Sequence, residues 1–468
     1  METVDRKREQ HDGVGGEKGE IIGVRASTGG VVVFLAAIFA SMPPASSRLG
    51  VTAFLALYAT ALALWFTLAR QSRLQKLPPA FAVTVTVAII LRAAFLPFDP
   101  TLSQDVQRYR WDGLVAKSGA NPYRYPPEAP ELAQLHTNWH RLINHPEIAT
   151  IYPPAAQGLF ALLALAGNSL FVWRLAFLAF DLATIRLLRP RDAWLWATCP
   201  LVVVEGFWSL HLEIAAVALL VASVRAVAQR NSATGGVAAG LAAGMKVVPI
   251  AALPALALFS NRRARFVAFA LVTLIAPALP FLSMGPLMPG FGDYASRWEF
   301  NAPLYESVHW LVDAAHIDNA AKTLFTSLKD PLHAESIAPF VYAQLHAERM
   351  ARAICLLAFL AGLFAAVRLP TLEARVAWSI AALLIVSPAL HPWYWLVLLP
   401  FAFEAESFLL VALAVASPAS YLLYGGGAVM TAAARSMAWL VPAITALVYR
   451  RRIGFSRPEA PVNQAPAA

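Results

Sequence analysis

Charged residues are scarce in this sequence. Of its 468 residues, 14% are charged and 58% are hydrophobic. A soluble protein carries about a quarter charged residues, and it does not sustain repeated apolar runs of about 20 residues. The composition therefore excludes an ordinary soluble domain. It predicts an all-α polytopic membrane protein, because helices satisfy their own backbone polar groups within lipid.

Cysteine is also nearly absent. The two cysteines, Cys199 and Cys355, both lie in apolar stretches, which argues against a disulfide framework and against a cysteine metal site. The sequence also lacks a P-loop, a dinucleotide-binding glycine pattern, an HExxH motif and a GxSxG motif. Nucleotide-driven transport and hydrolase chemistry therefore have no support in the sequence.

The net charge of +9 does not indicate nucleic acid as a partner, because the basic residues form short clusters at the ends of apolar segments. Four such clusters are Arg70, Arg73 and Lys76; Arg186, Arg189 and Arg191; Arg262, Arg263 and Arg265; and Arg450, Arg451 and Arg452. Cytoplasmic loops of membrane proteins carry an excess of lysine and arginine. Placing all four clusters in the cytoplasm puts both termini inside and two long polar loops outside.

Apolar segments recur along the whole chain, and the usual length criterion gives roughly twelve transmembrane helices. The segments are Gly30–Met42, Val51–Ala69, Phe81–Pro97, Leu170–Leu188, Trp194–Leu210, Ile214–Ala228, Phe266–Leu282, Ala353–Val367, Val376–Ala389, Trp393–Phe403, Phe408–Tyr424 and Val429–Tyr449. Two further stretches, Ala155–Ala166 and Gly235–Phe259, must not cross if the basic clusters are to share one side. The first is too short, and Gly244, Pro249 and Pro254 interrupt the second. Both are therefore predicted to be re-entrant segments lining a protein cavity.

The polar ends of the chain are distinct from this apolar region. Residues 1–28 mix both charges with glycine and lack apolar periodicity, which predicts a disordered cytoplasmic tail. Residues 453–468 are predicted to form a second such tail. Residues 29–452 then form one transmembrane domain, with residues 98–153 as its first outer loop and residues 285–350 as its second.

The first outer loop contains the segments SQDVQRYRWDG, GANPYRYPP and TIYPPAAQG. If the first of these is helical, Asp105, Arg108, Tyr109 and Asp112 lie at i, i+3, i+4 and i+7 and share one face. A carboxylate there could accept a proton from an attacking hydroxyl group, and the arginine could bind a phosphate with its planar fork. The alternative is an exposed ion pair between Asp105 and Arg108, which contributes little stability.

The proline-rich segments and the embedded polar residues also have two interpretations each. Asn121-Pro122-Tyr123 and Tyr152-Pro153-Pro154 could be simple turns with tyrosines at the membrane interface. Lys246 is an ionisable residue within an apolar segment, where it could reach a donor phosphate or snorkel to one interface. His211 and His391 could bind an acceptor sugar or a phosphate, or be ordinary hydrogen-bonded histidines. No chemistry is assigned to Arg174, Asp181 and Glu205.

Taken together, the segments of the first loop closely resemble the first outer loop of GT-C fold glycosyltransferases. The positions that carry the resemblance are Asp105, Arg108-Tyr109, Trp111-Asp112-Gly113, Gly119, Asn121-Pro122-Tyr123 and Tyr152-Pro153-Pro154. The loop looks most like that of the bacterial polyprenyl-phosphate-mannose-dependent mannosyltransferases and their arabinofuranosyl relatives. The resemblance implies a GT-C-like helix bundle with Asp105 as the catalytic base, and Asp112 matches a second acidic position of the family.

Four later segments extend the resemblance along most of the chain. They are His211-Leu212-Glu213, Gly240-Leu241…Gly244…Lys246…Pro249, Arg297-Trp298-Glu299-Phe300-Asn301, and Ser387-Pro388…His391-Pro392-Trp393-Tyr394. Glu213 stands where aspartate is more usual in the family. The resulting candidates for substrate binding are Arg108, Tyr109, Asp112, Asn121, Tyr123, Tyr152, His211, Glu213, Lys246, Arg297 and His391.

The function predicted from these features is inverting transfer of mannose or another hexose at the outer face of the cell membrane. The donor would be a polyprenyl-phosphate-linked sugar within the lipid bilayer, and the acceptor a glycan or a glycolipid. Asp105 and Asp112 do not form a tight DxD motif, so a divalent cation, Mg²⁺ or Mn²⁺, is compatible with the site but not implied.

Two other classes of protein would explain part of the sequence. A lipid or sugar transporter or flippase would account for the hydrophobicity and the embedded charges, but not for the aromatic, proline and acidic residues gathered in one outer loop. A lipid-using ligase or polymerase would normally carry its main functional loop late in the chain, whereas here the strongest signal is early.

Overall fold

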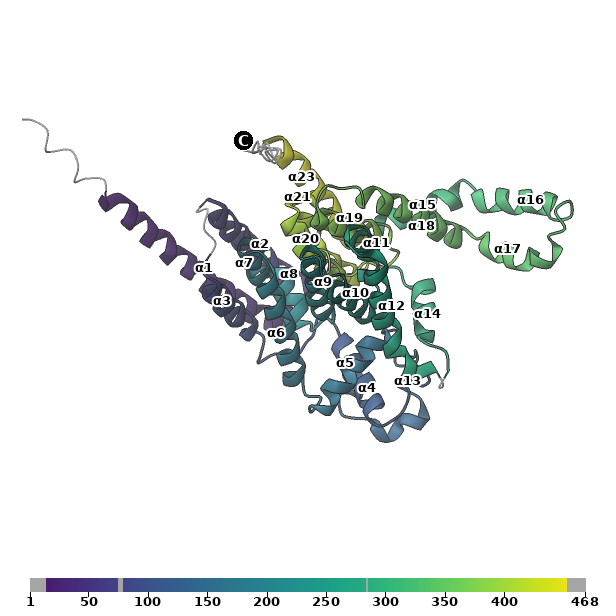
Figure 1. The fold of residues 1–468 in the computed structure, drawn as a ribbon, viewed down its shortest axis with the longest axis horizontal. Helices are drawn as coiled ribbons and strands as arrows, with labels where there is room; N and C mark the ends of the chain where they lie inside the picture. Colours follow the sequence, from purple (N-terminus) through teal and green to yellow (C-terminus); the bar gives the residue numbers. More distant parts are fainter. Residues whose placement is uncertain (1–13, 75–78, 283–284, 453–468) are drawn as a thin grey trace, which may run out of the picture. The chain divides into compact units, whose positions relative to one another are not determined.

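The computed structural model describes residues 14–74, 79–282 and 285–452, and within these residues every regular element is a helix (Figure 1). An isolated parallel bridge joins Phe300 to Ala389. The all-α prediction is therefore confirmed for the described residues. The chain divides into two compact units, an N-terminal unit of residues 1–298 and a C-terminal unit of residues 299–468.

The N-terminal unit contains the first outer loop and the elements that surround it. Its α-helices are α1 (Val14–Leu49), α2 (Val51–Leu74), α3 (Phe81–Ala93), α4 (Asp105–Lys117), α5 (Pro154–Leu165), α6 (Leu170–Leu187), α7 (Pro190–Thr198), α8 (Pro200–Val203), α9 (Glu213–Ala228), α10 (Ser232–Met245), α11 (Leu253–Phe259), α12 (Arg263–Ile275), α13 (Leu279–Leu282) and α14 (Pro289–Arg297). Helix α4 covers most of the SQDVQRYRWDG segment, so the condition under which Asp105, Arg108, Tyr109 and Asp112 share one helix face is met.

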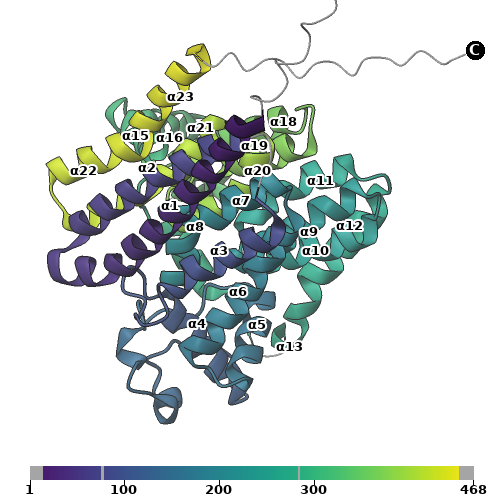
Figure 2. The same cartoon turned by 90° about the vertical axis from the view of Figure 1, so that its left-hand side faces the viewer.

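Helix α10 lies side by side with α9 and α12 (Figure 2). Its sequence places glycine at every fourth position, at Gly236, Gly240 and Gly244. A Cβ atom on Gly240 would lie 2.2 Å from the carbonyl oxygen of Ala270 in α12, and one on Gly236 would lie 2.4 Å from that of Phe266. Because only glycine leaves this space, the two helix backbones can approach closely.

Residues 232–260 form a hairpin whose two ends meet. The chain leaves helical geometry at Lys246, the residue after α10, and Pro249 follows in a short 3₁₀ helix that leads to α11. At the other end, the Ser232 hydroxyl donates to Oδ1 of Asn261 at 2.6 Å and lies 2.7 Å from the Ser260 hydroxyl. The segment thus returns to the point where it began, as a re-entrant segment must. Its position in a bilayer stays a prediction.

The C-terminal unit is also helical. Its α-helices are α15 (Pro303–Ala314), α16 (Ile317–Lys329), α17 (Ala338–Gln344), α18 (Ala347–Ala366), α19 (Leu372–Val386), α20 (Leu399–Glu404), α21 (Phe408–Ala416), α22 (Ala428–Arg435) and α23 (Val441–Arg452). Helices α15 and α18 lie side by side (Figure 1). The second predicted outer loop, residues 285–350, thus consists largely of short helices, from α14 to the start of α18.

Six helical segments are long and apolar enough to cross a membrane by length and composition. They are Thr28–Leu49, Val51–Gln71, Arg263–Leu282, Ala347–Ala366, Phe408–Gly425 and Ala428–Val448. Each overlaps one of the predicted apolar segments. The other predicted segments form shorter helices, such as α3 and α9, or a helix with more charges, α6, which contains Arg174, Asp181 and Arg186. The figure of roughly twelve crossings stays a prediction.

The predicted tails fall mainly at the margins of the described chain. Helix α1 begins at Val14, and residues 1–13 of the first predicted tail lie outside the described residues. The second predicted tail, residues 453–468, also lies outside them.

Candidate active site

Helices α4 and α5 pack together at the base of the candidate site. Pro154 occupies the first turn of α5, where a missing N–H leaves no intrahelical bond unmade. Gly113 lets the helices touch, because a Cβ atom there would lie 2.3 Å from the carbonyl oxygen of Phe160. Tyr109 of α4 stacks on Phe160 with ring centroids 5.0 Å apart. The first turns of α4 are thereby held beside the start of α5.

Asp105 is the first residue of α4. Its backbone N–H donates to the Ser103 hydroxyl at 3.2 Å, and Asn144 donates through Nδ2 to its Oδ1 at 3.2 Å. Its Oδ2 lies 3.7 Å from Nδ1 of His211, and its side chain stays 16% exposed. Asp105 is therefore held in position yet partly accessible, as a proton acceptor must be.

His211 lies between two carboxylates. Its Nε2 is 3.4 Å from Oε2 of Glu205, and both side chains are fully buried. Glu205 belongs to a π-helix, Val204–Trp208, an irregularity that often marks functional sites. Three side chains from α4, this π-helix and the turn before α9 are therefore placed together.

Glu213 and Lys246 form an ion pair beside this group. Nζ of Lys246 lies 3.0 Å from Oε1 of Glu213 and 5.1 Å from the ring centroid of Tyr152. The Glu213 side chain is fully buried, whereas that of Lys246 is 12% exposed. A Cβ atom on Gly244 would lie 2.8 Å from Cβ of Ala155, so the glycine lets the end of α10 reach α5.

Tyr109 and Tyr152 form the aromatic part of the site. Their ring centroids are 4.9 Å apart, in an edge-on arrangement. Burial raises the pKa of the Tyr109 phenol well above its usual range, and burial raises that of Tyr152 in the same way. Both phenols therefore stay neutral and can serve as hydrogen-bond donors.

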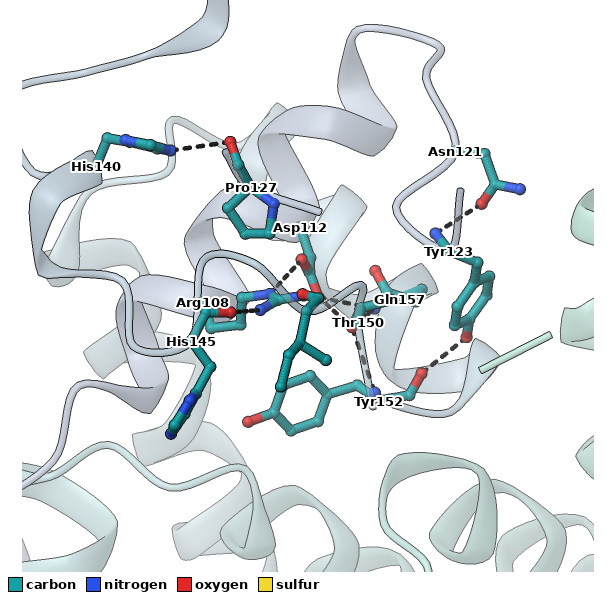
Figure 3. A network of polar contacts seen from close by, with 11 residues as sticks. Arg108, Asp112, Asn121, Tyr123, Pro127, His140, His145, Thr150, Tyr152 and Gln157 are labelled. Atoms are coloured by element: carbon teal, nitrogen blue, oxygen red, sulfur yellow. Dashed lines mark hydrogen bonds and ion pairs between the residues drawn. The ribbon is translucent and has the colours of Figure 1, made fainter. Parts of the chain in front are cut away.

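Arg108 points into the loop rather than toward Asp105. Its Nε donates to Oδ1 of Asp112 at 3.0 Å, and its other nitrogens donate to the carbonyl oxygens of Ile148 at 2.7 Å and His145 at 3.4 Å (Figure 3). The predicted alternative of an exposed ion pair between Asp105 and Arg108 is wrong. Arg108 is buried and pairs with Asp112, one turn further along the same helix.

Asp112 is the centre of a buried network. Its Oδ2 accepts hydrogen bonds from the Thr150 hydroxyl and from Nε2 of Gln157, the latter at 3.0 Å (Figure 3). Gln157 also donates to the Thr150 hydroxyl oxygen at 2.9 Å. A buried carboxylate with three donors is well compensated. These hydrogen bonds connect α4 to the loop that precedes α5 and to the first turn of α5.

Asn121 and Tyr123 hold the middle of the first outer loop. The side-chain oxygen of Asn121 accepts from the backbone N–H of Tyr123 at 2.9 Å, and the Tyr123 hydroxyl donates to the carbonyl oxygen of Tyr152 at 2.8 Å (Figure 3). Burial raises the pKa of the Tyr123 phenol, which keeps it a neutral donor. These contacts link the two proline-rich segments. Asn121 and Tyr123 thus hold the loop in shape around the site.

Two predicted site residues have surroundings of a different kind. Arg297 is 76% exposed in side chain and lies 3.5 Å from Asp293, one turn earlier in α14. His391, in the C-terminal unit, stacks on Phe300 and on Trp393, each with ring centroids 4.4 Å apart. The backbone of Phe300 bonds to Pro388 and Leu390. Two segments of the family resemblance, distant in sequence, therefore meet in that unit.

The charges to which no chemistry was assigned have two different environments. Asp181 accepts from Arg92 at 2.9 Å and from Nε1 of Trp196 at 2.7 Å, and Arg174 donates to the carbonyl oxygens of Leu96 and Phe98. Asp181 and Arg174 therefore make their polar contacts within the N-terminal unit. Glu205 differs, because it contacts His211.

The residues missed in the sequence are Glu205, Asn144, Thr150 and Gln157. Asn144 lies in a segment without a recognisable motif. Glu205 does give a signal, because it is an ionisable residue within the predicted apolar segment Trp194–Leu210, but no chemistry was assigned to it. Among the described residues, no group of three or more histidine, cysteine or acidic side chains is arranged to hold a metal ion.

Comparison with known proteins gives a match over somewhat more than half of the chain. A family model described as glycosyltransferase family 87 matches residues 150–388. The matched region contains Tyr152, His211, Glu213 and Lys246, and it begins after Asp105. No curated protein and no solved structure matches the chain.

Proposed function

The chain belongs to glycosyltransferase family 87, a family of membrane glycosyltransferases of the GT-C type, and on this premise we propose the reaction that it catalyses. It transfers a hexose, with mannose as the first choice, from a polyprenyl-phosphate donor to a glycan or lipid acceptor. The reaction takes place at the outer face of the cytoplasmic membrane, and it inverts the anomeric configuration.

The observation that carries this proposal is the grouping of Asp105, His211, Glu213 and Lys246 around one turn. His211 faces Asp105 at 3.7 Å, and Glu213, two residues later, binds Lys246 at 3.0 Å. An acidic residue that can accept a proton and a lysine that can bind a phosphate thus lie on either side of residues 211–213. This is the pair of groups that a single displacement at an anomeric carbon needs.

In the proposed step, the acceptor hydroxyl oxygen attacks C1 of the donor sugar while its proton passes to the Asp105 carboxylate. The new C1–O bond forms as the C1–O bond to phosphate breaks, and the bonding electrons leave with the phosphate. Attack from the side opposite the leaving group inverts C1. The 16% exposure of Asp105 supports its role, because a base must reach the acceptor and later release its proton to water.

Lys246 supplies positive charge for the leaving phosphate. In the structure Nζ lies 3.0 Å from Oε1 of Glu213, so the lysine is in place before a donor arrives. Electrostatic stabilisation by groups already in place is usually a large part of catalysis. Tyr152, whose ring lies 5.1 Å from Nζ, fixes the direction of the lysine.

The absence of a nucleotide-binding sheet from the described residues supports the proposal of a lipid-linked donor. The described residues are helical and contain no Rossmann-like sheet that could hold a nucleotide sugar. A lipid-linked donor that reaches the site through the bilayer needs no such sheet. No observation in the structure favours the transporter alternative, whereas the family match favours an enzyme.

The test is transfer by the purified protein in proteoliposomes. Polyprenyl-phosphate-mannose and a nucleotide-linked mannose, both radiolabelled, are offered separately with membrane glycolipids as acceptors. Labelled product is expected only from the lipid-linked donor. Transfer from the nucleotide sugar with no lipid carrier present would refute the donor assignment, and no transfer from either would refute the sugar or the acceptor class.

A further inference from the structure

Glu205 is a buried carboxylate that the reaction described above does not use. Its side chain is fully buried, and Oε2 lies 3.4 Å from Nε2 of His211. The opposite ring nitrogen of His211, Nδ1, faces Asp105 at 3.7 Å. The imidazole therefore lies between a carboxylate that solvent cannot reach and one that the acceptor can reach.

The backbone around Glu205 also indicates a functional role for this residue. Glu205 lies in a π-helix of five residues, Val204–Trp208, which directly follows α8. An inserted residue in a helix turns the side chains that follow it, and such insertions persist mainly where they place a functional group. The backbone N–H of His211 also donates to the carbonyl oxygen of Glu205 at 3.0 Å. Glu205 thus contacts His211 through both its backbone and its side chain.

We propose that Glu205 is a positioning residue that holds His211 oriented and protonated beside Asp105. The proposal rests on the proposed function, in which Asp105 is the base. A buried charge is stable only when it is paired, and a protonated imidazole can donate to both carboxylates at once. The imidazolium then favours the ionised form of Asp105 until the acceptor proton arrives.

The roles within the reaction separate clearly. Asp105 alone exchanges a proton with the acceptor, and it returns that proton to water through its exposed edge. His211 keeps its protons throughout and contributes charge. Glu205 contributes the charge that keeps His211 protonated. Apart from the proton that Asp105 takes up and releases, only the donor and the acceptor change their covalent bonds.

Other charged or titratable groups lie near Glu205, His211 and Asp105. They are Tyr109 on α4, Glu213 on α9, Lys246 after α10, and Tyr58 on α2, which lies within electrostatic reach of Glu205. Lys246 is matched by Glu213, and the two tyrosines are neutral near pH 7. Two carboxylates therefore face one histidine, and removing either one disfavours the imidazolium.

The test is the pH dependence of transfer by Glu205→Gln in proteoliposomes with polyprenyl-phosphate-mannose as donor. Glutamine keeps the shape and the hydrogen-bonding reach but removes the charge. Losing a nearby opposite charge lowers the pKa of a cationic group by about 1–3. The alkaline limb of the kcat profile should therefore move to lower pH by about that amount, with KM for the donor changed less than about twofold.

Three further measurements distinguish a positioning role of Glu205 from a purely structural one. The proposal predicts recovery as the pH falls, because acid restores the imidazolium without help from Glu205; kcat of Glu205→Gln should then return to within about threefold of wild type. Glu205→Asp, which keeps the charge, should retain the wild-type pH profile. The matched control is Asp192→Asn, because Asp192 is another buried carboxylate of the same unit but pairs with Arg191; its profile should not move.

An unshifted profile for Glu205→Gln, or a parallel loss of kcat at every pH with a lower Tm, would overturn the proposal. The wild-type protein is measured in the same experiment. If wild type transfers mannose and only the shift is missing, the inference about Glu205 fails and the proposed function stands. If wild type does not transfer at all, the proposed function fails first, and the role of Glu205 in it fails with it.

Discussion

At the scale of single residues, the site is a set of paired charges. Lys246 faces Glu213, His211 faces both Asp105 and Glu205, and only Asp105 and Lys246 retain some exposure. Pairing lowers the cost of burying each charge. It also leaves the two partly exposed groups, one anionic and one cationic, as those that can meet substrate.

The role of Asp105 is tested by Asp105→Asn. The amide keeps the shape of the side chain but cannot accept the acceptor proton, and loss of general-base help typically costs about a hundredfold to ten-thousandfold in rate. We expect kcat to fall within that range in the proteoliposome assay. Donor binding and Tm should change little.

The control for this experiment is Asp318→Asn in α16, an ion-pair partner of Lys322 outside the candidate site. Its rate should match that of wild type, because the pair is partly open to solvent and i, i+4 pairs of this kind contribute little. Transfer by Asp105→Asn within a few-fold of wild type would remove Asp105 from the mechanism.

Lys246 has two separable contributions, one to stability and one to transfer. Lys246→Met leaves the buried Glu213 facing no cation at this position, and breaking a buried pair costs about 3–5 kcal/mol of unfolding free energy. The double variant with Glu213→Gln removes both charges and should regain most of that stability. It should not regain transfer, because the phosphate still meets no lysine.

Lys246→Arg is the matched comparison, since it keeps the charge but changes the geometry, and it should lose less activity than Lys246→Met. Thermal unfolding and labelled-mannose transfer are measured on all three variants. If the double variant regained transfer together with stability, Lys246 would be a structural lysine only.

The sequence was informative about residues whose chemistry stands out from an apolar surround. Lys246 interrupts an apolar stretch, and Asp105 precedes a recognisable loop motif, so both could be identified. Glu205 also interrupts an apolar stretch, but its contact with His211 arises at a π-helix that no periodicity reveals. Arg108 was assigned to phosphate binding from its planar fork, yet its donors meet Asp112 and two carbonyl groups. Which partner an arginine meets depends on how the loop folds back.

At the scale of elements, α10 determines where Lys246 lies. The helix ends at Met245, and its glycines let it approach α12 on one side and α5 on the other. A shift of α10 would therefore move Lys246 relative to Glu213 and Tyr152. Close packing transmits such shifts, because protein interiors leave little free volume.

Gly240→Ala tests this dependence. A Cβ atom would lie 2.2 Å from the carbonyl oxygen of Ala270, so α10 and α12 must separate, and overpacking of this kind costs about 1–3 kcal/mol. We expect a lower Tm and slower transfer. Gly158→Ala in α5 is the control, because nothing lies within 4 Å of its added Cβ and alanine favours a helix by about 1 kcal/mol. Equal Tm values for the two variants would contradict the close approach of α10 and α12.

Elements that begin at strong local signals were predicted closely. The predicted stretch Ala155–Ala166 corresponds to α5, Pro154–Leu165, because a proline pair starts the helix. The second outer loop was harder. Its helices, such as α16 and α17, have polar as well as apolar faces, so a search for long apolar runs passes over them. Helices α16 and α17 also contact each other through the Thr326 and Tyr342 hydroxyls and through the Phe325 and Tyr342 rings. A sequence pattern does not show such contacts.

At the scale of the whole molecule, the family match and the apolar helices agree that this is a membrane glycosyltransferase. The direction in which it lies in the membrane was predicted from the basic clusters. In a background with Cys199 and Cys355 replaced by alanine, both being buried free cysteines, single cysteines can report the side. Exposed positions suit this best, and Ala133, Ser336 and Ala264 are exposed.

Cysteines at Ala133 and Ser336, in the two predicted outer loops, should react with an impermeant thiol reagent in intact cells. One at Ala264, within the cluster of Arg262, Arg263 and Arg265, should react only after the membrane is permeabilised. The reverse pattern would place the candidate site on the cytoplasmic side, where a nucleotide sugar would be available as donor.

The hairpin of residues 232–260 makes the same experiment sharper. Because the Ser232 hydroxyl contacts Ser260 and Asn261, the exposed residue Thr234 must lie on the same side of the membrane as Ala264. A cysteine at Thr234 should therefore be protected in intact cells and label after permeabilisation, as one at Ala264 does. If the segment crossed the membrane instead, the two positions would label from opposite sides. That outcome would also move Lys246 from the tip of a re-entrant hairpin to the interior of a span, where it could not meet a phosphate at the membrane edge.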